Sequence, residues 1–269
     1  MNIKSRVSGL LRRAGLLSTA EKARYYWQRW KYKKQNDQFR KENPGFTLPP
    51  EFFIYETYRL NYKWYHDEGK NSAEEAIELL SKHIDLKKSN INILDWGCGP
   101  GRVTRHFPSL LPDARIFGSD YNEKYIEWCK DHLKGITFSL NKIDPPTNYQ
   151  GDFFDIVIGL SIFTHLSEKG HFDWMNELYR IVKPGGFVLI TTQGKIYYSI
   201  LSTAEKKLFD SNSLVIRKYP DEGNRLYSSF QPIEFIKQLI KEKFNVVEII
   251  PGELNNGEPA QDIWVLKKI

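Results

Sequence analysis

The chain has 269 residues, of which 41% are hydrophobic and 27% are charged, and these values exclude wholesale disorder. This length holds one large α/β domain with an appendage and leaves no room for a second domain of full size. The net charge of +6 is uneven. Residues 1–42 contain twelve Lys or Arg against three acids, a net +9, which leaves −3 for the remainder. An anionic partner is therefore expected to meet this N-terminal arm first.

The sequence predicts neither a membrane-spanning nor an exported protein. No run approaches the roughly 18 apolar residues that a span requires, and Met1 to Leu17 lacks the apolar segment of a signal peptide. The only cysteines are Cys98 and Cys129, so neither a disulfide framework nor a cysteine metal site is indicated. We expect a cytoplasmic protein, with peripheral contact at the inner membrane surface as an option.

The N-terminal arm, residues 1–42, is predicted to be helical. Apolar residues recur on one helical face between Ile3 and Leu17, and Ser18 with Glu21 has the form of a capping box for a second helix that runs to about Arg40. Prolines then end the helix, and residues 43–86 are predicted to form a helical lid or linker with an amphipathic stretch before the first strand.

Strands and helices alternate in residues 87–269, which predicts a parallel sheet wrapped by helices. After Thr192 the alternation lapses, so residues 193–230 are interpreted as an insertion, followed by a helix near 232–241 and a closing hairpin. The predicted strands are Asn92 to Asp95, Arg115 to Ser119, Ile136 to Leu140, Asp155 to Leu160, Phe187 to Thr192, Asn245 to Ile250 and Asp262 to Lys267.

The segment from Leu94 to Arg102, LDWGCGPGR, has the form of a strand, a glycine-rich turn and a helix that Val103 opens. Glycines there let the backbone turn sharply and approach a ligand closely. Asp120 ends the second strand about twenty residues later, where a carboxylate can accept hydrogen bonds from both ribose hydroxyls of an adenosine. Asn141 to Ile143 follow the third strand, where they could meet an adenine edge, although a surface-loop role for Asn141 stays open.

These residues resemble the class I S-adenosylmethionine-dependent methyltransferases, whose first motif has the form of Asp95 to Gly101. The resemblance covers roughly residues 73–269 and includes FDIVIGLSIFTHL from Phe154 and LYRIVKPGG from Leu178. It implies a Rossmann-like α/β fold, with a seven-stranded, mostly parallel sheet and an antiparallel last strand. The competing nicotinamide interpretation is disfavoured, because a dinucleotide loop usually spaces its third glycine one residue further on.

The resemblance also implies roles for individual residues. Gly97, Cys98 and Gly99 would face the methionine part of S-adenosylmethionine, Asp120 the ribose, Tyr121 and Ile143 the adenine, and Leu160 the sulfonium. The full set of expected cofactor-binding residues is Asp95, Gly97, Cys98, Gly99, Gly101, Asp120, Tyr121, Asn141, Ile143, Leu160 and Ser161. No metal site is expected.

His165 is the candidate catalytic residue, because a base within hydrogen-bond reach assists transfer to a hydroxyl and histidine titrates near neutral pH. A capping or packing role for His165 is the alternative, and Ser161 and Thr164 also suit caps. Asp144, Pro145 and Pro146 are similar to a motif of enzymes that methylate exocyclic amines of nucleic-acid bases, but they precede the fourth strand instead of following it. Nucleic acid is therefore a disfavoured acceptor.

Pro49 and Pro50 before an aromatic helix, and Gln261 and Asp262 before the last strand, look similar to methyltransferases of bacterial surface-polysaccharide pathways. That resemblance implies a hydroxyl of a sugar, glycan or small molecule as acceptor. Aromatic rings suit stacking on sugar faces, although they also suit packing. The rings considered are Trp64, Tyr65, Tyr197 and Tyr198.

Three interpretations of residues 1–42 stay open: an interfacial membrane helix, which the leucines and arginines favour slightly, a nucleic-acid contact, or a helix pair that is solvated or packs on another subunit. Two rival functions also remain, a non-catalytic S-adenosylmethionine-binding partner of a glycan-assembly complex and an RNA methyltransferase that uses the basic arm. The sequence does not indicate the oligomeric state.

Overall fold

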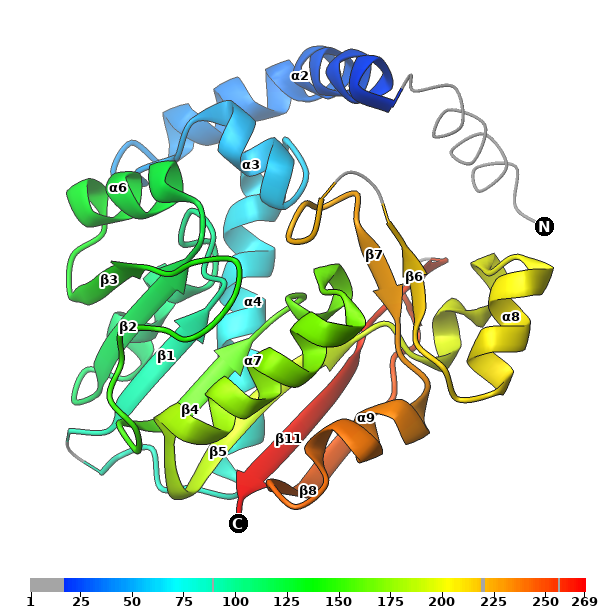
Figure 1. The fold of residues 1–269 in the computed structure, drawn as a ribbon. Coiled ribbons are helices and arrows are strands. Elements are labelled where there is room, and N and C mark those ends of the chain that lie inside the picture. Colours follow the sequence, from blue (N-terminus) through cyan, green and yellow to red (C-terminus); the bar gives the residue numbers. More distant parts are fainter. Residues whose placement is uncertain (1–16, 89, 219–220, 256) are drawn as a thin grey trace.

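The structure is a computed structural model, and it describes residues 17–88, 90–218, 221–255 and 257–269. A central sheet of seven strands runs through the described part of the chain, in the order β3-β2-β1-β4-β5-β11-β8 (Figure 1). Its strands are β1 (Asn92–Trp96), β2 (Arg115–Asp120), β3 (Ile136–Leu140), β4 (Phe154–Gly159), β5 (Val182–Thr192), β8 (Phe244–Ile250) and β11 (Asp262–Lys268).

The last strand is the antiparallel one. β11 pairs antiparallel with β5, where Trp264 lies opposite Ile190, and antiparallel with β8, where Trp264 lies opposite Ile249. The pairs β1 with β2, β1 with β4, β2 with β3 and β4 with β5 are all parallel. The predicted fold class and the predicted closing hairpin are therefore confirmed.

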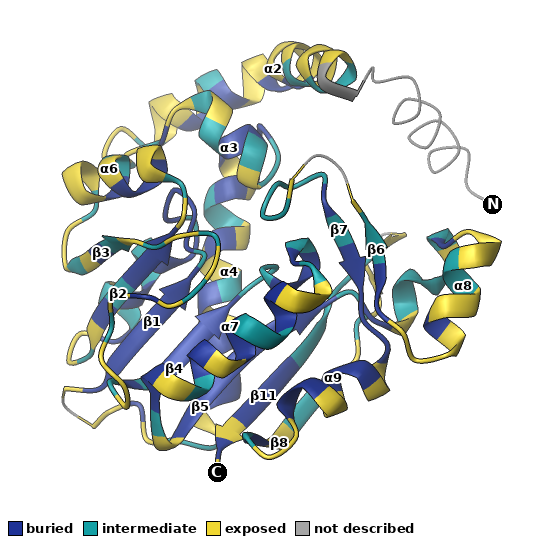
Figure 2. Cartoon of the chain, viewed as in Figure 1, coloured by how far each residue is buried: buried dark blue, intermediate teal, exposed yellow. Residues whose placement is uncertain are grey.

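Alternate residues of each strand face two separate apolar cores, as the pleat of a strand requires. In β1, Ile93 belongs to one core and Leu94 to the other, and in β4 Ile156 and Val157 divide in the same way. Because both faces are covered by helices, the inner strands are buried along nearly their whole length (Figure 2).

Different helices cover the two faces of the sheet. α4 (Tyr62–Ser81) and α5 (Phe107–Leu110) contribute Ala76 and Phe107 to one core, whereas α7 (Glu168–Ile181) and α9 (Ile233–Ile240) contribute Leu178 and Leu239 to the other. α6 (Glu123–His132) packs on β3 through a smaller cluster that contains Cys129. The described helices thus form two layers around the sheet.

The helix expected to open at Val103 is not continuous. A 3₁₀ helix, η1 (Thr104–His106), precedes the single α-helical turn of α5. Pro108 lies at the start of that turn, where proline is tolerated, and the helix ends before Pro112. Proline lacks the N–H that a longer helix would use, which explains the short element.

Two helices precede the α/β body. α2 (Leu17–Glu42) ends close to the predicted position, and α3 (Glu51–Thr57) follows the prolines. The capping box predicted at Ser18 is wrong, because Leu17 and Ser18 are already helical and the Glu21 carboxylate instead accepts a hydrogen bond of 2.7 Å from the Tyr55 hydroxyl. The helix predicted from Ile3 to Leu17 falls almost wholly outside the described residues, which begin at 17.

The second half of α4 is part of the sheet core. Ala73, Ala76, Leu79 and Leu80 are buried and pack with strand residues such as Ile91. Residues 43–86, expected as a lid or linker, therefore include a helix that covers one face of the sheet. Among the described residues, no helix is long and apolar enough to cross a membrane.

Residues 193–230, expected as an insertion, lie between β5 and α9. They form η3 (Lys195–Ile200), α8 (Thr203–Asp210) and a small antiparallel pair of β6 (Val215–Arg217) and β7 (Ser228–Phe230). A third 3₁₀ helix, η2 (Phe163–His165), follows β4, and β9 (Leu254–Asn255) pairs with β10 (Glu258–Pro259) before β11. Most of these short elements lie beside the carboxyl ends of the strands (Figure 1).

Candidate functional site

The glycine-rich turn connects β1 to η1 through backbone that only glycine adopts easily. Gly97, Gly99 and Gly101 have φ angles of +76°, +54° and +71°. The Gly97 N–H donates a hydrogen bond of 2.7 Å to the Ser119 carbonyl, which ties the turn to the end of β2. A side chain at any of the three positions would strain this backbone.

Asp120 ends β2 and is held by backbone donors. Its carboxylate accepts hydrogen bonds from the Gly99 N–H at 2.9 Å and from the Asn122 N–H at 2.8 Å. Burial raises the pKa of Asp120 to about 6, although the backbone N–H groups around it oppose this shift. The carboxylate is therefore fixed in direction and remains ionised at neutral pH.

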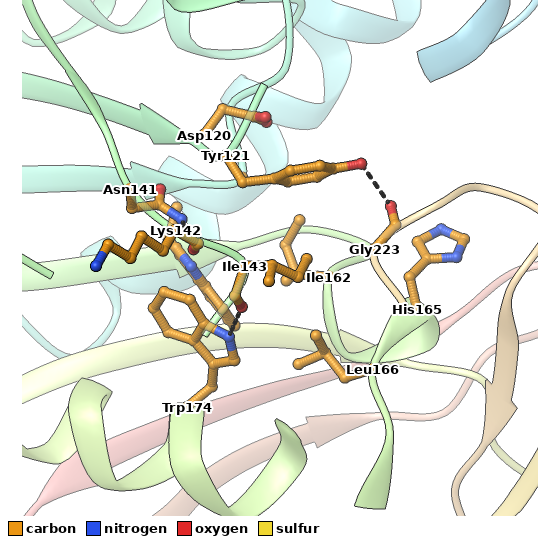
Figure 3. A pocket seen from close by; sticks show the side chains of 12 residues that line it. Asp120, Tyr121, Asn141, Lys142, Ile143, Ile162, His165, Leu166, Trp174 and Gly223 are labelled. Atoms are coloured by element: carbon orange, nitrogen blue, oxygen red, sulfur yellow. Dashed lines mark hydrogen bonds between the residues drawn. The ribbon is translucent and has the colours of Figure 1, made fainter. Parts of the chain in front are cut away.

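A pocket opens beside Asp120 at the carboxyl ends of β1, β2, β3 and β4, and we name it the strand-end pocket (Figure 3). The space between its lining atoms is about 420 Å³, open solvent included. Its lining residues are Trp96, Gly97, Asp120, Tyr121, Asn141, Lys142, Ile143, Ile162, His165, Leu166, Trp174 and Gly223.

Several residues predicted from the sequence meet in this pocket: Gly97, Asp120, Tyr121, Asn141, Ile143 and His165. The Tyr121 ring spans towards Gly223, whose carbonyl accepts a hydrogen bond of 3.1 Å from the tyrosine hydroxyl. The Oδ1 atom of Asn141 is buried and has no hydrogen-bond partner within the described protein. An unpaired buried oxygen on the pocket wall is the kind of group that a ligand donor satisfies.

His165 also lines the strand-end pocket. Its Nδ1 lies 2.6 Å from the carbonyl oxygen of Tyr227, so the neutral ring carries its proton on Nδ1 and donates it to that carbonyl. Burial lowers the pKa of His165, which keeps the ring neutral and leaves Nε2 as an acceptor at pH 7. This geometry permits a base and equally permits a residue that positions the Tyr227 loop, so the catalytic assignment stays a prediction.

Two expected cofactor-binding side chains face away from the strand-end pocket. The Asp95 carboxylate is buried and accepts a short hydrogen bond from the Thr104 hydroxyl. The Cys98 side chain lies in the apolar cluster with Cys129 and Phe138. A role for Cys98 at a ligand would therefore belong to its backbone, and a role for Asp95 would be to shape the turn.

A second, larger cavity lies on the α4 side of the same strand ends, and we name it the α4 cavity. Residues from α4, from the glycine turn, from the ends of β4 and β5 and from the segment before β11 line it, and they include Glu68, Arg102, Leu160, Ser161, Thr191 and Gln261. Leu160 and Ser161 thus line the α4 cavity, whereas the next residue, Ile162, lines the strand-end pocket. The segment 160–162 separates the two spaces.

Polar groups fix the conformation of Ser161 at this boundary. Ser161 has a φ angle of +63°, which is uncommon for a residue with a side chain. Its N–H donates to the Thr191 hydroxyl at 2.7 Å, and its own hydroxyl donates to the Gln261 amide oxygen at 3.0 Å. The cap role considered for Ser161 and Thr164 is wrong. The Thr164 hydroxyl donates a bond of 2.7 Å to the Ser161 carbonyl, and the residue that caps α7 is Ser167.

Sequence inspection missed several residues that the fold brings to the two spaces. Trp174 comes from α7 and donates a hydrogen bond of 2.9 Å from its Nε1 to the Ile143 carbonyl. Gly223 comes from the insertion, where no periodicity indicated a site. Arg102 closes the glycine-rich segment, but the local sequence does not indicate its partner. Its guanidinium lies 4.7 Å from the centre of the ring of Tyr58, the residue that follows α3.

Comparison with protein families gives a match over residues 93–186, to a methyltransferase domain. A malonyl-[acyl-carrier protein] O-methyltransferase of Bacillus cytotoxicus is 26% identical over 181 residues, which are 64% of this chain and 59% of that protein. A tRNA (carboxymethyluridine(34)-5-O)-methyltransferase of Arabidopsis thaliana is 36% identical over 100 residues, 37% of this chain and 23% of that protein. The chain thus spans about half to two thirds of the malonyl-[acyl-carrier protein] relatives and less of the tRNA enzyme.

Solved structures share the fold. A magnesium protoporphyrin IX methyltransferase of Synechocystis, solved with bound SAH, matches with a TM-score of 0.55 and 13% identity over 91% of this chain and 99% of that one. A SAM-dependent methyltransferase structure from Methanosarcina mazei matches with a TM-score of 0.54 and 14% identity over 71% and 97%. The expected methyltransferase class and its expected cofactor, S-adenosylmethionine, agree with these matches. Residues 93–186 thus match the methyltransferase domain family, and they lie within a seven-stranded sheet of the Rossmann-like methyltransferase fold.

Proposed function

We propose that this protein is an S-adenosylmethionine-dependent methyltransferase whose acceptor is a hydroxyl of a sugar, a glycan or another small polar molecule. One observation carries the proposal: two cavities lie at the carboxyl ends of the strands, and consecutive residues of the segment 160–162 line one and then the other. One cavity has groups that suit an adenosine, and the other has groups that suit a polar acceptor. A methyl donor and an acceptor that react directly need such adjoining sites.

The residues of the strand-end pocket fit the cofactor. Asp120 presents a buried, oriented carboxylate that can accept from ribose hydroxyls, and the unpaired Oδ1 of Asn141 can accept from the exocyclic amine of an adenine. Gly97 has no side chain, and a Cβ there would overlap Ile162, so glycine at this position lets Ile162 pack directly on the turn at the pocket wall. Leu160, Ser161 and the turn glycines would extend the site towards the α4 cavity.

When bound, S-adenosylmethionine supplies a methyl group on a sulfonium, and transfer of that group to a hydroxyl leaves S-adenosylhomocysteine and releases one proton. The chain must orient the acceptor and provide a route for this proton. Within the strand-end pocket, Nε2 of His165 is a neutral acceptor at pH 7 because its Nδ1 is committed to Tyr227. We keep His165 as the proposed base, which requires the acceptor hydroxyl to reach past the segment 160–162 into the strand-end pocket, because His165 does not line the α4 cavity. Positioning of the Tyr227 loop is its alternative.

The α4 cavity suits a neutral polyhydroxylated acceptor. Its wall has hydroxyl and amide groups at Ser72, Thr191 and Gln261, and aromatic rings at Trp64 and Tyr197 that can pack on the apolar faces of a sugar. Of the other two rings considered for stacking, Tyr65 is buried beneath Pro100, and the Tyr198 hydroxyl donates to Asp210 within the insertion. Two of the four considered rings, Trp64 and Tyr197, therefore line the α4 cavity.

The charges of the α4 cavity disfavour a polyanion. Four glutamates line it, Glu68, Glu75, Glu253 and Glu258, against the two arginines Arg59 and Arg102, and Arg59 is already paired with Glu258. A nucleic-acid strand would meet net negative charge here. This charge balance favours a sugar hydroxyl over RNA as the acceptor. Of the two arginines that line the cavity, only Arg102 is left to pair with a carboxylate such as that of a malonyl group.

The experiment is a transfer assay of the full chain with methyl-labelled S-adenosylmethionine and four acceptor classes: oligosaccharides, small alcohols, malonyl-acyl carrier protein and RNA. We expect label in the first or second class, lost in Asp120→Ala. Label only in malonyl-acyl carrier protein or RNA would overturn the hydroxyl acceptor while keeping methyl transfer. Cofactor binding by calorimetry without transfer to any class would favour a non-catalytic binding partner.

A further inference from the structure

The helix α2 has one face that docks on the protein and one face that does not. Gln28, Tyr32, Asn36 and Phe39 recur at helical spacing and are buried. The Gln28 side-chain oxygen accepts a hydrogen bond of 2.9 Å from the Leu60 N–H, and the Asn36 side-chain amide donates one of 3.1 Å to the Leu60 carbonyl. These contacts fix the rotation of α2, so the opposite face must point outward (Figure 2).

The outward face has three large aromatic side chains within five residues. Tyr26, Trp27 and Trp30 are 62%, 52% and 78% exposed. Exposed tryptophan is costly in water and is not explained by the packing of this helix, since the inner stripe already anchors it. A cluster of such exposed rings on a fixed helix indicates a binding surface, either for a membrane or for another molecule.

Free positive charge surrounds the three rings. Within the described part of α2, Lys22, Lys31, Lys34 and Lys41 form no ion pair with any described carboxylate, whereas Lys33 pairs with Asp37 at 2.6 Å. The Lys31 ammonium lies 4.7 Å from the centre of the Trp27 ring, so charge and aromatic surface are contiguous. The patch therefore offers apolar rings framed by cations.

We propose that the outer face of α2, centred on Trp27 and Trp30, binds the surface of a bilayer that contains anionic phospholipid. Tryptophan and tyrosine rings favour the boundary between headgroups and acyl chains, and unpaired lysines favour anionic headgroups. A single-stranded nucleic acid could also stack on these rings, but the outward row lies along one rigid helix with no groove to follow a strand, which favours a flat surface.

The position of α2 relates this surface to the two cavities. α2 lies at the end of the molecule towards which the parallel strands point (Figure 1). α3 connects the two regions, because its Tyr55 bonds Glu21 of α2 and its Thr57 lies against Gly99 of the glycine turn. A bilayer on α2 would therefore lie at the same end as the proposed acceptor site, which suits an acceptor attached to a lipid.

The test is co-sedimentation of the full chain with vesicles of phosphatidylcholine alone and of equimolar phosphatidylcholine and phosphatidylglycerol. We expect partition only into the anionic vesicles. Lys31→Ala with Lys34→Ala should lower the partition coefficient about thirtyfold, at roughly 1 kcal/mol for each lysine near the surface. Trp27→Ala with Trp30→Ala should lower it at least tenfold. The matched control is Leu208→Ala with Ile233→Ala, which removes exposed apolar side chains of 48% and 50% exposure elsewhere and should change nothing.

A second measurement tests directly whether Trp27 and Trp30 contact the acyl chains. Dibrominated acyl chains in the anionic vesicles should quench tryptophan fluorescence, and Trp27→Phe with Trp30→Phe should remove most of that quenching while the protein still binds. Unchanged partition of the tryptophan-to-alanine variant would overturn the proposal, as would binding to an RNA homopolymer without binding to anionic vesicles. Calorimetric affinity for S-adenosylmethionine checks that each variant is folded, and because the proposal does not rest on methyl transfer, the two can fail separately.

Discussion

The carboxylate of Asp120 accepts the Gly99 N–H at 2.9 Å, so the acidic end of β2 also holds the glycine turn that follows β1. One residue thus shapes the wall of the strand-end pocket and presents charge into it. Substitutions at Asp120 must therefore be examined for ligand affinity and for fold stability together.

Asp120→Ala should weaken binding of S-adenosylmethionine by about 10- to 150-fold, because loss of a charged hydrogen-bond acceptor costs roughly 1.5 to 3 kcal/mol. Calorimetry on the full chain measures the affinity. Asp113→Ala, at an exposed aspartate, is the matched control and should leave the affinity unchanged. An unaltered affinity in Asp120→Ala would remove this residue from the binding site.

The affinity for S-adenosylmethionine should also depend on pH. Burial raises the pKa of Asp120 to about 6, so the carboxylate that accepts from the ribose is progressively protonated as the pH falls through 6. We expect binding to weaken between pH 7 and pH 5 in the natural protein and to be nearly flat in Asp120→Ala. A parallel decline in both proteins would assign the dependence to another group.

Asp95→Asn should stabilise the ligand-free protein at neutral pH by about 1 to 3 kcal/mol. Burial raises the pKa of Asp95 to about 6, above the value of about 4 expected in the unfolded chain, so the native state binds this proton more tightly. The stability that this provides is complete below pH 4 and is lost as the pH rises through 6. Asparagine keeps an acceptor for the Thr104 hydroxyl without the buried charge.

Urea unfolding at pH 7.5 and pH 4 measures the effect of Asp95→Asn, with Asp113→Asn as control. The difference between the variant and the natural protein should shrink towards pH 4. A loss of stability at pH 7.5 that disappears at pH 4 would show that the buried charge is favourable overall.

The two roles of His165 can be separated by a pair of variants. If His165 is the base, His165→Ala and His165→Asn should both lower kcat by at least about 100-fold and leave the affinity for S-adenosylmethionine nearly unchanged. If it positions the Tyr227 loop, asparagine should recover most of the activity, because its amide can replace Nδ1 as donor to the Tyr227 carbonyl. Initial rates with an acceptor found by the transfer assay described above decide between these outcomes.

Gly97→Ala should abolish tight cofactor binding and destabilise the protein. Its φ angle of +76° is costly for alanine by about 1 to 2 kcal/mol, and the new Cβ would overlap the Ile162 side chain. Ile162→Ala in the same chain should restore part of the stability by removing the overlap, but not the part due to the backbone. Thermal unfolding of the two variants and of the single Ile162→Ala control measures both contributions.

The sequence was sufficient for the sheet because its strands are buried on both faces and leave continuous apolar runs, as in Ile156 to Ile158. Asp120 could be predicted because its position depends only on local features, a strand end about twenty residues after a glycine turn. The antiparallel last strand was predicted from the family resemblance and the turn residues, and the pairing of β11 confirms it.

Other parts of the site depend on contacts between distant segments, which local patterns do not encode. Gly223, in the aperiodic insertion, reaches the strand-end pocket because its N–H donates a hydrogen bond of 2.9 Å to the carbonyl of His165, which lies 58 positions earlier in the chain. The direction of the Cys98 side chain is likewise set by tertiary packing, since the turn has no period from which an inward or outward face could be inferred. The helix predicted from Val103 is interrupted for a local reason, because Pro108 has no N–H with which to continue it.

The segment around Gly223, which lines the strand-end pocket, is connected to the helices α2 and α3 by Arg225. Arg225, two residues after Gly223, donates a hydrogen bond of 2.9 Å to the Tyr55 hydroxyl and forms an ion pair with Glu21, in surroundings whose burial lowers the pKa of its guanidinium to about 10. Removing the basic arm to improve handling of the protein would delete Glu21 and leave a half-buried arginine without its carboxylate. Binding constants measured on such a shortened protein would describe a looser pocket than the one that the complete chain presents to its ligands.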